Sequence, residues 1–458
     1  MTIHSEWAKL FYHECPQAFS ESVKSTKLDV GIIDGHLQLM CLNEFLVTWD
    51  RFIQSMFLRP IEQMFKMGCK TVVVCFDAYE HVPVFKNMTQ HKRSQGREVC
   101  TFDPQQDLPK HIPHDTMKYL MNRVFKLKVI QLLCEKLPSL VQLSEGQEFI
   151  IDYKTVVHYS PGNGMIPKLM SEFKPMGESD VKFTRYVQKY GNALVHAIDG
   201  DYMVIALLYY SNVGVHEKNK MFLYRQCQKS YDTLVGESKS TKRKLEKRDE
   251  FDEEPESKQK KDKKKKCWVD MQLIFVSIIE AFRQSVVHES KVVSRFFPSQ
   301  AESSEQRDFI RAAVFLILCA GTDFSRQLPL IGPQRLWDLL PQVGTYLIDA
   351  TKSSNVDSML NVFVSKVYKT VFYKHIQSKG STWSAIYESL QKSALSASTK
   401  NRIPDESQLL TTIKNVMWVI QYWDTVNDKV STPLDGSCGF LLCRSSGKVI
   451  FEDLLKCQ

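Results

Sequence analysis

Three short runs of apolar, mostly β-branched residues each end on an aspartate. The runs are LDVGIID, KTVVVCFD and ALVHAID, and they end at Asp34, Asp77 and Asp199. Short runs of this kind suit strands that are covered on both faces, as in a parallel sheet. The pattern therefore predicts three parallel strands, each with a carboxylate at its carboxyl end.

Helical periodicity separates these strands and dominates the second half of the chain. Their alternation with helices predicts an open α/β sheet, whose functional site lies beyond the carboxyl ends of the strands. A stretch reading EFIIDYKTVVHYSPGNG predicts a β-hairpin extension. The helices are expected at 38–67, 115–137 and 178–190 in the first half, and at 268–286, 306–320, 333–341, 355–377 and 406–423 in the second.

Composition favours an intracellular protein. The 458 residues are 43% hydrophobic, enough for two folded modules or one large α/β domain with insertions. No apolar run reaches the roughly 20 residues that span a bilayer, and the N-terminus lacks a secretory pattern. Twelve scattered cysteines without a CxxC pair indicate reduced thiols and do not support a zinc site.

The net charge of +8 is unevenly distributed. Residues 237–266 hold 13 Lys/Arg against 9 Asp/Glu, half of the total. This segment has almost no apolar side chains, so it predicts a disordered insertion. It is either a nuclear-localisation or phosphate-attracting segment or a solvated linker. Net charge alone therefore says little about partners.

Further acids follow the same spacing as the pair that ends the third strand. Glu178 and Asp180 repeat the one-residue gap of Asp199 and Asp201, with an offset of 21 residues in both cases. A seventh acid, Asp323, follows a long apolar helix. Each acid taken singly could simply cap a strand or helix.

Together, seven carboxylates in one cleft would repel one another, and divalent cations remove that repulsion. Two Mg²⁺ ions roughly 4 Å apart can activate water and stabilise the leaving oxygen of a phosphodiester. The acids therefore predict a metal-dependent site for phosphodiester cleavage.

These acids resemble the constellation of the flap endonuclease/XPG family of structure-specific 5′ nucleases, which share a PIN-like fold. VGIIDGH and VVVCFDAY match the first two family aspartates, GESD matches the acidic EAEA motif, and GTDF matches the GSDY aspartate. The resemblance implies an α/β fold with a mostly parallel sheet flanked by helices, a helical arch and a C-terminal helix–two-turn–helix region. It also implies two Mg²⁺ ions, for which Mn²⁺ may substitute. The first ion would be held by Asp34, Asp77, Glu178 and Asp180, and the second by Asp199, Asp201 and Asp323.

Basic residues between the acids also match the family. FKNMTQHKR supplies Lys86 and Arg93 at the spacing of the family's phosphate-gripping pair. LPLIGPQRLWDLL resembles the helix–two-turn–helix, so Gly332 and Arg335 are expected to contact the DNA backbone at a helix N-terminus. Lys118, Arg123 and Lys126 lie on a predicted helix in the arch region. That helix suits either a single strand threading beneath it or ordinary packing on the sheet.

The chain also departs from the family pattern at several positions. Thr2 replaces the second-position glycine, Met40 replaces a stacking aromatic, and Leu330 replaces one glycine of the two-turn motif. No clear sliding-clamp peptide is present. The resemblance divides the chain into an N-terminal nuclease region (1–100), an arch or cap (101–170), an internal nuclease region (171–236), the Lys-rich insertion (237–266), the end of the nuclease core (267–345) and a mostly helical C-terminal region (346–458).

The sequence therefore predicts a magnesium-dependent 5′ nuclease that cleaves DNA near junctions of single and double strands. Branched or flapped DNA is the expected partner, in the nucleus or at a site of DNA replication, with a monomer expected and no membrane. Two rivals stay open. One is a 5′→3′ exoribonuclease of the related PIN-like group, and the other is a degenerate member that binds nucleic acid as a scaffold.

Overall fold

The computed structural model describes most of the residues of the chain. They are residues 3–20, 22–23, 27–42, 48–78, 100–161, 167–173, 176–197, 199–216, 218–227, 265–286, 304–321, 332–353, 356–369, 382–401, 403–425, 440–443 and 448–451.

The centre of the fold is a nine-stranded mixed sheet, ordered β1-β9-β8-β7-β2-β3-β4-β5-β6. The five strands from β8 to β4 run parallel, and antiparallel strands extend both edges. A mostly parallel α/β sheet is thus confirmed. The strands are β1 (Phe19–Ser20), β2 (Val30–Asp34), β3 (Thr71–Cys75), β4 (Glu148–Asp152), β5 (Val156–Tyr159), β6 (Lys168–Leu169), β7 (Ala193–His196), β8 (Met221–Cys227) and β9 (Lys265–Asp270).

Helices cover both faces of this sheet, as the continuous apolar strands require. Alternate residues of β2 show the two faces: Ile33 packs with the helices between β2 and β4, and Ile32 with those on the other side. On the first face lie α2 (Gly35–Met40), α3 (Trp49–Ile53), the π-helical η3 (Gln54–Leu58), α4 (Arg59–Lys66), α6 (Thr116–Met121) and α7 (Arg123–Leu140). On the second lie α8 (Ser179–Tyr190) and α9 (Asp201–Val213).

The order of the strands reverses at β2. From β2 the chain moves outward to β3 and β4, then returns to β7 on the other side of β2 and continues to β8. Open α/β sheets bind ligands beyond the carboxyl ends of the strands at such a reversal. The topology therefore places the expected site where β3, β2 and β7 end.

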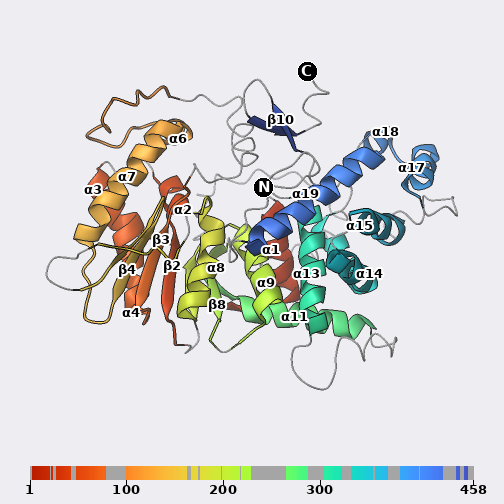
Figure 1. Cartoon of the computed structure of the whole chain (residues 1–458), viewed down its shortest axis with the longest axis horizontal. Helices are drawn as coiled ribbons and strands as arrows, with labels where there is room; N and C mark the ends of the chain where they lie inside the picture. Colours follow the sequence, from red (N-terminus) through yellow and green to blue (C-terminus); the bar gives the residue numbers. More distant parts are fainter. Residues whose placement is uncertain are drawn as a thin grey trace, which may run out of the picture.

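A second group of helices packs beside the sheet (Figure 1). A small hairpin of β10 (Phe440–Cys443) and β11 (Lys448–Phe451) follows these helices. The helices are α11 (Met271–Val286), α13 (Ser304–Cys319), α14 (Pro333–Ser353), α15 (Val356–Val362), η4 (Phe363–Tyr368), α17 (Trp383–Lys392), α18 (Ala397–Lys400) and α19 (Glu406–Thr425).

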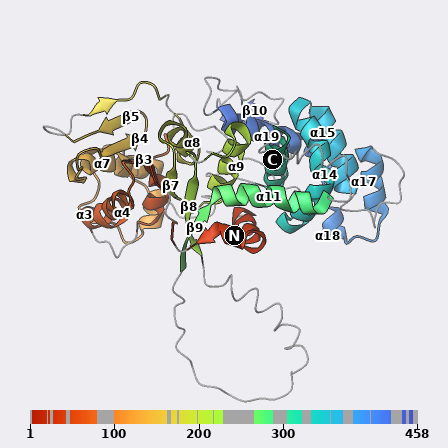
Figure 2. The same cartoon turned by 90° about the horizontal axis from the view of Figure 1, so that it is seen from below.

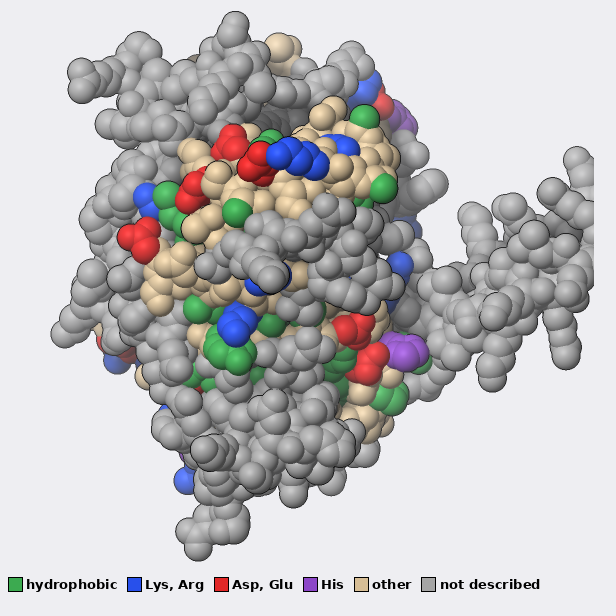
Figure 3. Space-filling model, turned by 90° about the vertical axis from the view of Figure 1, so that its right-hand side faces the viewer, with side chains coloured by type: hydrophobic (Ala, Val, Ile, Leu, Met, Phe, Trp, Pro, Cys, Tyr) green, Lys and Arg blue, Asp and Glu red, His purple; other side chains and the backbone are tan. Residues whose placement is uncertain are grey.

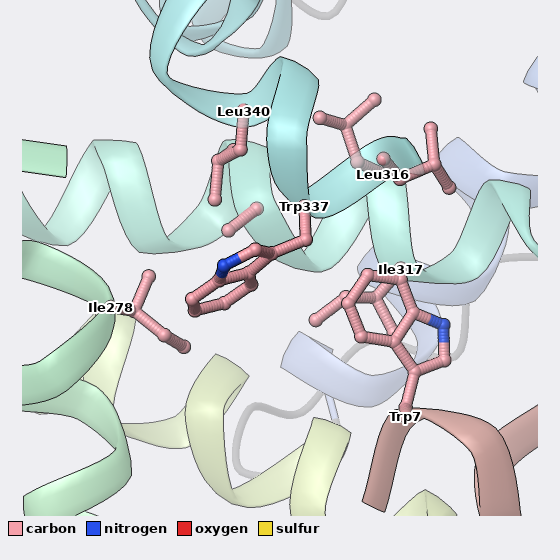
Figure 4. A pocket seen from close by; sticks show the side chains of 8 residues that line it. Trp7, Ile278, Leu316, Ile317, Trp337 and Leu340 are labelled. Atoms are coloured by element: carbon pink, nitrogen blue, oxygen red, sulfur yellow. The ribbon is translucent and has the colours of Figure 1, made fainter. Parts of the chain in front are cut away.

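The N-terminal helix α1 (Ile3–Glu14) belongs with these helices and not with the strands that follow it. Figure 2 shows it near α11, and Trp7 and Trp337 face one apolar space between α1, α11, α13 and α14 (Figure 4). That space measures about 10 Å³, hardly room for one water. It is a packing contact and not a ligand site.

Several predicted elements need correction. The helix expected at 268–286 begins only at Met271, because residues 265–270 form β9 and pair with β8. Lys265 and Lys266, placed in the disordered insertion, therefore belong to a strand, and the rest of that insertion lies outside the described residues. The helix expected at 38–67 is a short helix that ends at Met40 and a continuous helical run over 49–66, made of α3, η3 and α4, and the one at 333–341 extends to Ser353. The predicted hairpin is confirmed as β4 and β5, with β4 a full member of the parallel sheet.

No helix among the described residues combines the length and the apolar character needed to cross a membrane.

Candidate acidic active site

The three strands predicted to end on an acid are neighbours in the sheet. Asp34 closes β2, Asp77 follows β3 by two residues, and Asp199 follows β7 by three. Because β3, β2 and β7 are parallel and adjacent, their carboxyl ends meet at one edge. The strand assignment made from the sequence is confirmed.

Ser179 joins the first two aspartates to the start of α8. Its Oγ donates to Asp34 Oδ1 (3.2 Å), and its backbone N–H donates to Asp77 Oδ1 (2.9 Å). Asp34 Oδ1 also accepts the N–H groups of His36 (3.0 Å) and Leu37 (3.1 Å), so it caps α2. The acids on either side of Ser179 are Glu178 and Asp180, so α8 brings them to the same edge.

In the turn between β2 and α2, the backbone of Gly35 packs closely on the end of β3. A Cβ on Gly35 would lie 2.5 Å from the ring of Phe76 and 2.8 Å from the carbonyl oxygen of Cys75. Only glycine allows the residue after Asp34 to pack this tightly on the end of β3.

Most of these carboxylates are buried, with Asp199 the exposed exception. Burial raises the pKa of Asp34 to about 7, and repulsion from Asp77 and then Asp180 adds to the rise. Hydrogen bonds from Leu37 and Ser179 oppose it. The exposed fractions of the buried acids are 7% for Asp34, 2% for Asp77, 0% for Glu178, 8% for Asp180 and 3% for Asp201.

The first turn of α9 closes the cluster from the β7 side. The N–H of Asp201 donates to Asp199 Oδ1 (3.3 Å), so Asp199 caps the turn that carries Asp201. The next residue, Tyr202, is buried. Burial raises the pKa of Tyr202 well above its usual value, and the charges of Asp34 and Asp180 raise it further. The charge of Asp180 thus acts on the first turn of α9, and the starts of α8 and α9 lie side by side at this edge.

The acids fit a divalent cation by donor type. Carboxylate oxygens are the ligands that Mg²⁺ prefers, and a cation would relieve the repulsion that Asp77 and Asp180 exert on Asp34. Within the described part of the chain, no group of three or more Asp, Glu, His or Cys already stands in metal-ligating arrangement. Three predicted site residues, Lys86, Arg93 and Asp323, lie outside the described residues.

Two histidines at this edge were not expected from the sequence. His36 Nδ1 lies 3.4 Å from Asp77 Oδ2, and His196 Nδ1 lies 2.7 Å from Gln38 Nε2 while its ring stacks on Tyr224. Their places in the chain could have indicated that both lie at this edge, because His196 ends β7 and His36 lies two residues beyond the end of β2.

A further buried carboxylate lies in the same row of the sheet. Asp152 ends β4 and is aligned with Cys75 of β3, which is aligned with Asp34 of β2. Lys182 and Arg185 of α8 both pair with Asp152. Although burial alone would raise it, these two cations hold the pKa of Asp152 below its usual value.

The predicted DNA-binding residues outside the acids fall in two places. Gly332 and Arg335 line an open cleft of about 450 Å³ at the start of α14, opposite Lys9 and His13 of α1. Arg123 is exposed at the start of α7, while the two predicted lysines nearby, Lys118 and Lys126, are half-buried.

Packing of α7 on the sheet is confirmed. Phe125, Val129, Leu133 and Leu137 are buried in the core on that face. Whether its basic side chains also meet a nucleic-acid strand stays a prediction.

Charge on the face formed by the C-terminal helices is mixed. Acidic and basic side chains lie near one another over its described part (Figure 3). That face is therefore a weaker candidate for a nucleic-acid surface than the cleft beside α14.

Comparison with models of known protein families finds no match, and comparison with curated proteins finds no significantly similar relative.

Proposed function

We propose that the protein is a metal-dependent 5′ nuclease with a PIN-like fold that acts on branched DNA. The observation that carries the proposal is the gathering of acids from β2, β3, α8 and α9 at the reversal point of a parallel sheet. Five of them are buried, and burial together with repulsion between the acids raises the pKa of Asp34. Such an arrangement has little use in a protein that only binds nucleic acid as a scaffold.

The acids would divide between two Mg²⁺ ions. Asp34, Asp77, Glu178 and Asp180 would hold the first, and Asp199, Asp201 and Asp323 the second. When bound, the ions supply an activated water and stabilise the leaving oxygen. Ser179 fixes the carboxylates of Asp34 and Asp77 in one orientation, which a metal site requires.

Positively charged groups would then orient the DNA. Lys86 and Arg93 would bind the scissile phosphate, the arginine through two parallel hydrogen bonds. Lys118, Arg123 and Lys126 would form part of a helical arch over the single strand.

The cleft beside α14 would hold the duplex. Pro333 is the first residue of α14, so the helix N-terminus there presents N–H groups, with Arg335, Lys9 and His13 nearby. A helix N-terminus with basic neighbours suits backbone phosphates, which fix register without reading bases. This is the role expected of a helix–two-turn–helix.

The direct test is cleavage of a 5′-labelled DNA flap in magnesium, with a matched duplex lacking the flap. We expect cutting near the flap base that EDTA abolishes. Asp199→Asn should lower kcat by roughly 100-fold or more, because it removes a charged ligand from the reacting centre. Glu172→Gln is the matched control, since Glu172 is an exposed acid paired with Lys189. It should cleave like the wild type.

Two results would count against the proposal. Binding of the flap without cleavage in both magnesium and manganese would favour the scaffold. Cleavage of single-stranded RNA with no preference for a junction would favour the exoribonuclease.

A further inference from the structure

Lys182 is a fully buried cation in the first turn of α8, two residues after Asp180. Its Nζ donates to three carbonyl oxygens, those of Phe76 (2.7 Å), Tyr153 (3.1 Å) and Asp152 (3.3 Å). It also pairs with Asp152 Oδ1 at 3.0 Å. Phe76 is the residue immediately before Asp77. Lys182 therefore ties the helix that carries Glu178 and Asp180 to the backbone beside Asp77.

The partner of Lys182 is itself held from the other side. Asp152 Oδ2 accepts a hydrogen bond from Tyr186 Oη (2.7 Å) and pairs with Arg185, whose guanidinium lies 4.9 Å from the centre of the Phe173 ring. All three charged groups are more than 90% buried.

Stability alone does not account for this network. Replacing a buried ion pair by apolar residues of similar size is often neutral for folding or even stabilising. What apolar residues cannot do is bind three carbonyl oxygens from two strand ends. The hydrogen bonds made by Lys182 determine where α8 sits along the ends of β3 and β4.

We propose that Lys182, oriented by Asp152, is a positioning residue that sets the spacing between Asp77 and the acids of α8. The inference rests on the proposed function, because that spacing matters where the acids share a divalent cation. Lys182 does not touch the cation. It acts through the backbone of Phe76 and through the first turn of its own helix.

The two ways in which Lys182 could affect metal binding predict opposite changes in metal affinity when it is removed. As a nearby positive charge, it repels a cation, so removing it would tighten metal binding. As a positioning residue it aligns the acids, so removing it would weaken metal binding. Groups that orient metal ligands typically change metal affinity by 10- to 100-fold when mutated. The direction of the change therefore separates the two roles.

The test is direct titration with Mn²⁺ in the absence of DNA, with free Mn²⁺ followed by electron paramagnetic resonance. We expect Lys182→Met to weaken Mn²⁺ binding by about 10-fold or more. Lys189→Met is the matched control on the same helix, because Lys189 is an exposed lysine paired with Glu172. It should bind Mn²⁺ like the wild type.

The folding of each variant is checked in a separate experiment. Circular dichroism and thermal unfolding in EDTA show whether each variant is native. If Lys182→Met does not fold, the combination of Asp152→Leu, Lys182→Met and Arg185→Met replaces the whole buried network with apolar side chains, and the same loss of Mn²⁺ affinity is expected from it.

The outcomes separate the inference from the proposed function. Unchanged or tighter Mn²⁺ binding by a folded Lys182 variant overturns the positioning role, whatever the nuclease activity. Absence of Mn²⁺ binding by the wild type overturns the metal site itself, and with it the proposed function.

Discussion

Asp34 and Asp152 stand in the same row of the sheet, with β3 between them, and their pKa values move in opposite directions. Both are buried at the carboxyl end of a parallel strand. Asp34 faces other carboxylates, so its pKa rises to about 7, whereas two cations hold the pKa of Asp152 down. The charges beside each carboxylate explain the difference: Asp77 and Asp180 lie near Asp34, whereas Lys182 and Arg185 of α8 pair with Asp152.

The pKa of Asp34 predicts a pH-dependent stability for the metal-free protein. Its folded-state pKa exceeds the unfolded value, so its contribution is most favourable below about pH 4 and is lost as the pH rises through about 7. In EDTA, Asp34→Asn should therefore gain stability over the wild type by roughly 2 to 3 kcal/mol more at pH 8 than at pH 5. Urea unfolding at both pH values measures this difference.

Asparagine keeps the capping oxygen of Asp34, so loss of the α2 cap does not confuse the comparison. An equal gain at both pH values would mean that the folded protein does not destabilise the charged form of Asp34.

The sequence could predict the carboxylate of Asp34 but not the role of Asp152. EFIID and VGIID have the same pattern, a short apolar run that ends on an acid, so the pattern does not distinguish Asp152 from Asp34. What distinguishes Asp152 is Lys182, 30 residues away and on a different element. Ser179 shows the opposite case, because its place between two predicted acids is a signal within the sequence itself.

Helices and strands were predicted correctly from the sequence where their own residues determine the secondary structure. The central strands and the helix over 178–190 were predicted because their apolar spacing is regular. The prediction of helix for 268–270 was wrong, because pairing with β8, and not the local sequence pattern, makes this segment a strand. Trp268 packs on Tyr224 of β8, and pairing with β8 supplies the hydrogen bonds. Such pairing cannot be seen in a local window.

Two kinds of substitution should distinguish the packing of α7 from the proposed nucleic-acid contact of α6 and α7. Phe125 is fully buried against Trp49, Phe102 and Tyr119, so Phe125→Ala should lower the free energy of unfolding by about 3 to 5 kcal/mol. Denaturant unfolding measures this effect.

Joint replacement of Lys118, Arg123 and Lys126 by alanine should leave stability nearly unchanged. It should weaken flap-DNA binding and flatten its salt dependence by about one unit of slope for each phosphate that these side chains bind. An unaltered salt dependence would show that α6 and α7 serve packing alone.

The whole molecule joins a sheet to a set of helices, and its large insertion begins and ends at two neighbouring strands of that sheet. Residues 228–264 lie between β8 and β9, and these strands pair antiparallel with Cys227 opposite Lys265. The ends of the insertion are thus adjacent, as in a hairpin. A long connection between adjacent ends costs little stability, since closure entropy grows slowly with length.

Replacing residues 228–264 by a two-residue Asn-Gly turn should therefore leave the protein folded. Asn-Gly is the preferred turn for such a hairpin. We expect a thermal midpoint at or above that of the full chain and unchanged flap cleavage in vitro, with any effect confined to localisation in cells. A loss of folding would show that the segment contributes to the core.

The position of α1 has a consequence for synthesis. Trp7, Leu10 and Phe11 are buried, and Phe11 packs edge-on against Trp337, a residue made more than 300 positions later. At typical translation rates the ribosome needs on the order of tens of seconds to cover that distance. Throughout this interval the part of α1 that packs on α14 is not yet covered, although η1 (Pro16–Ala18) and α11 are made earlier. We expect chaperones to stay bound to this helix until α14 has been made.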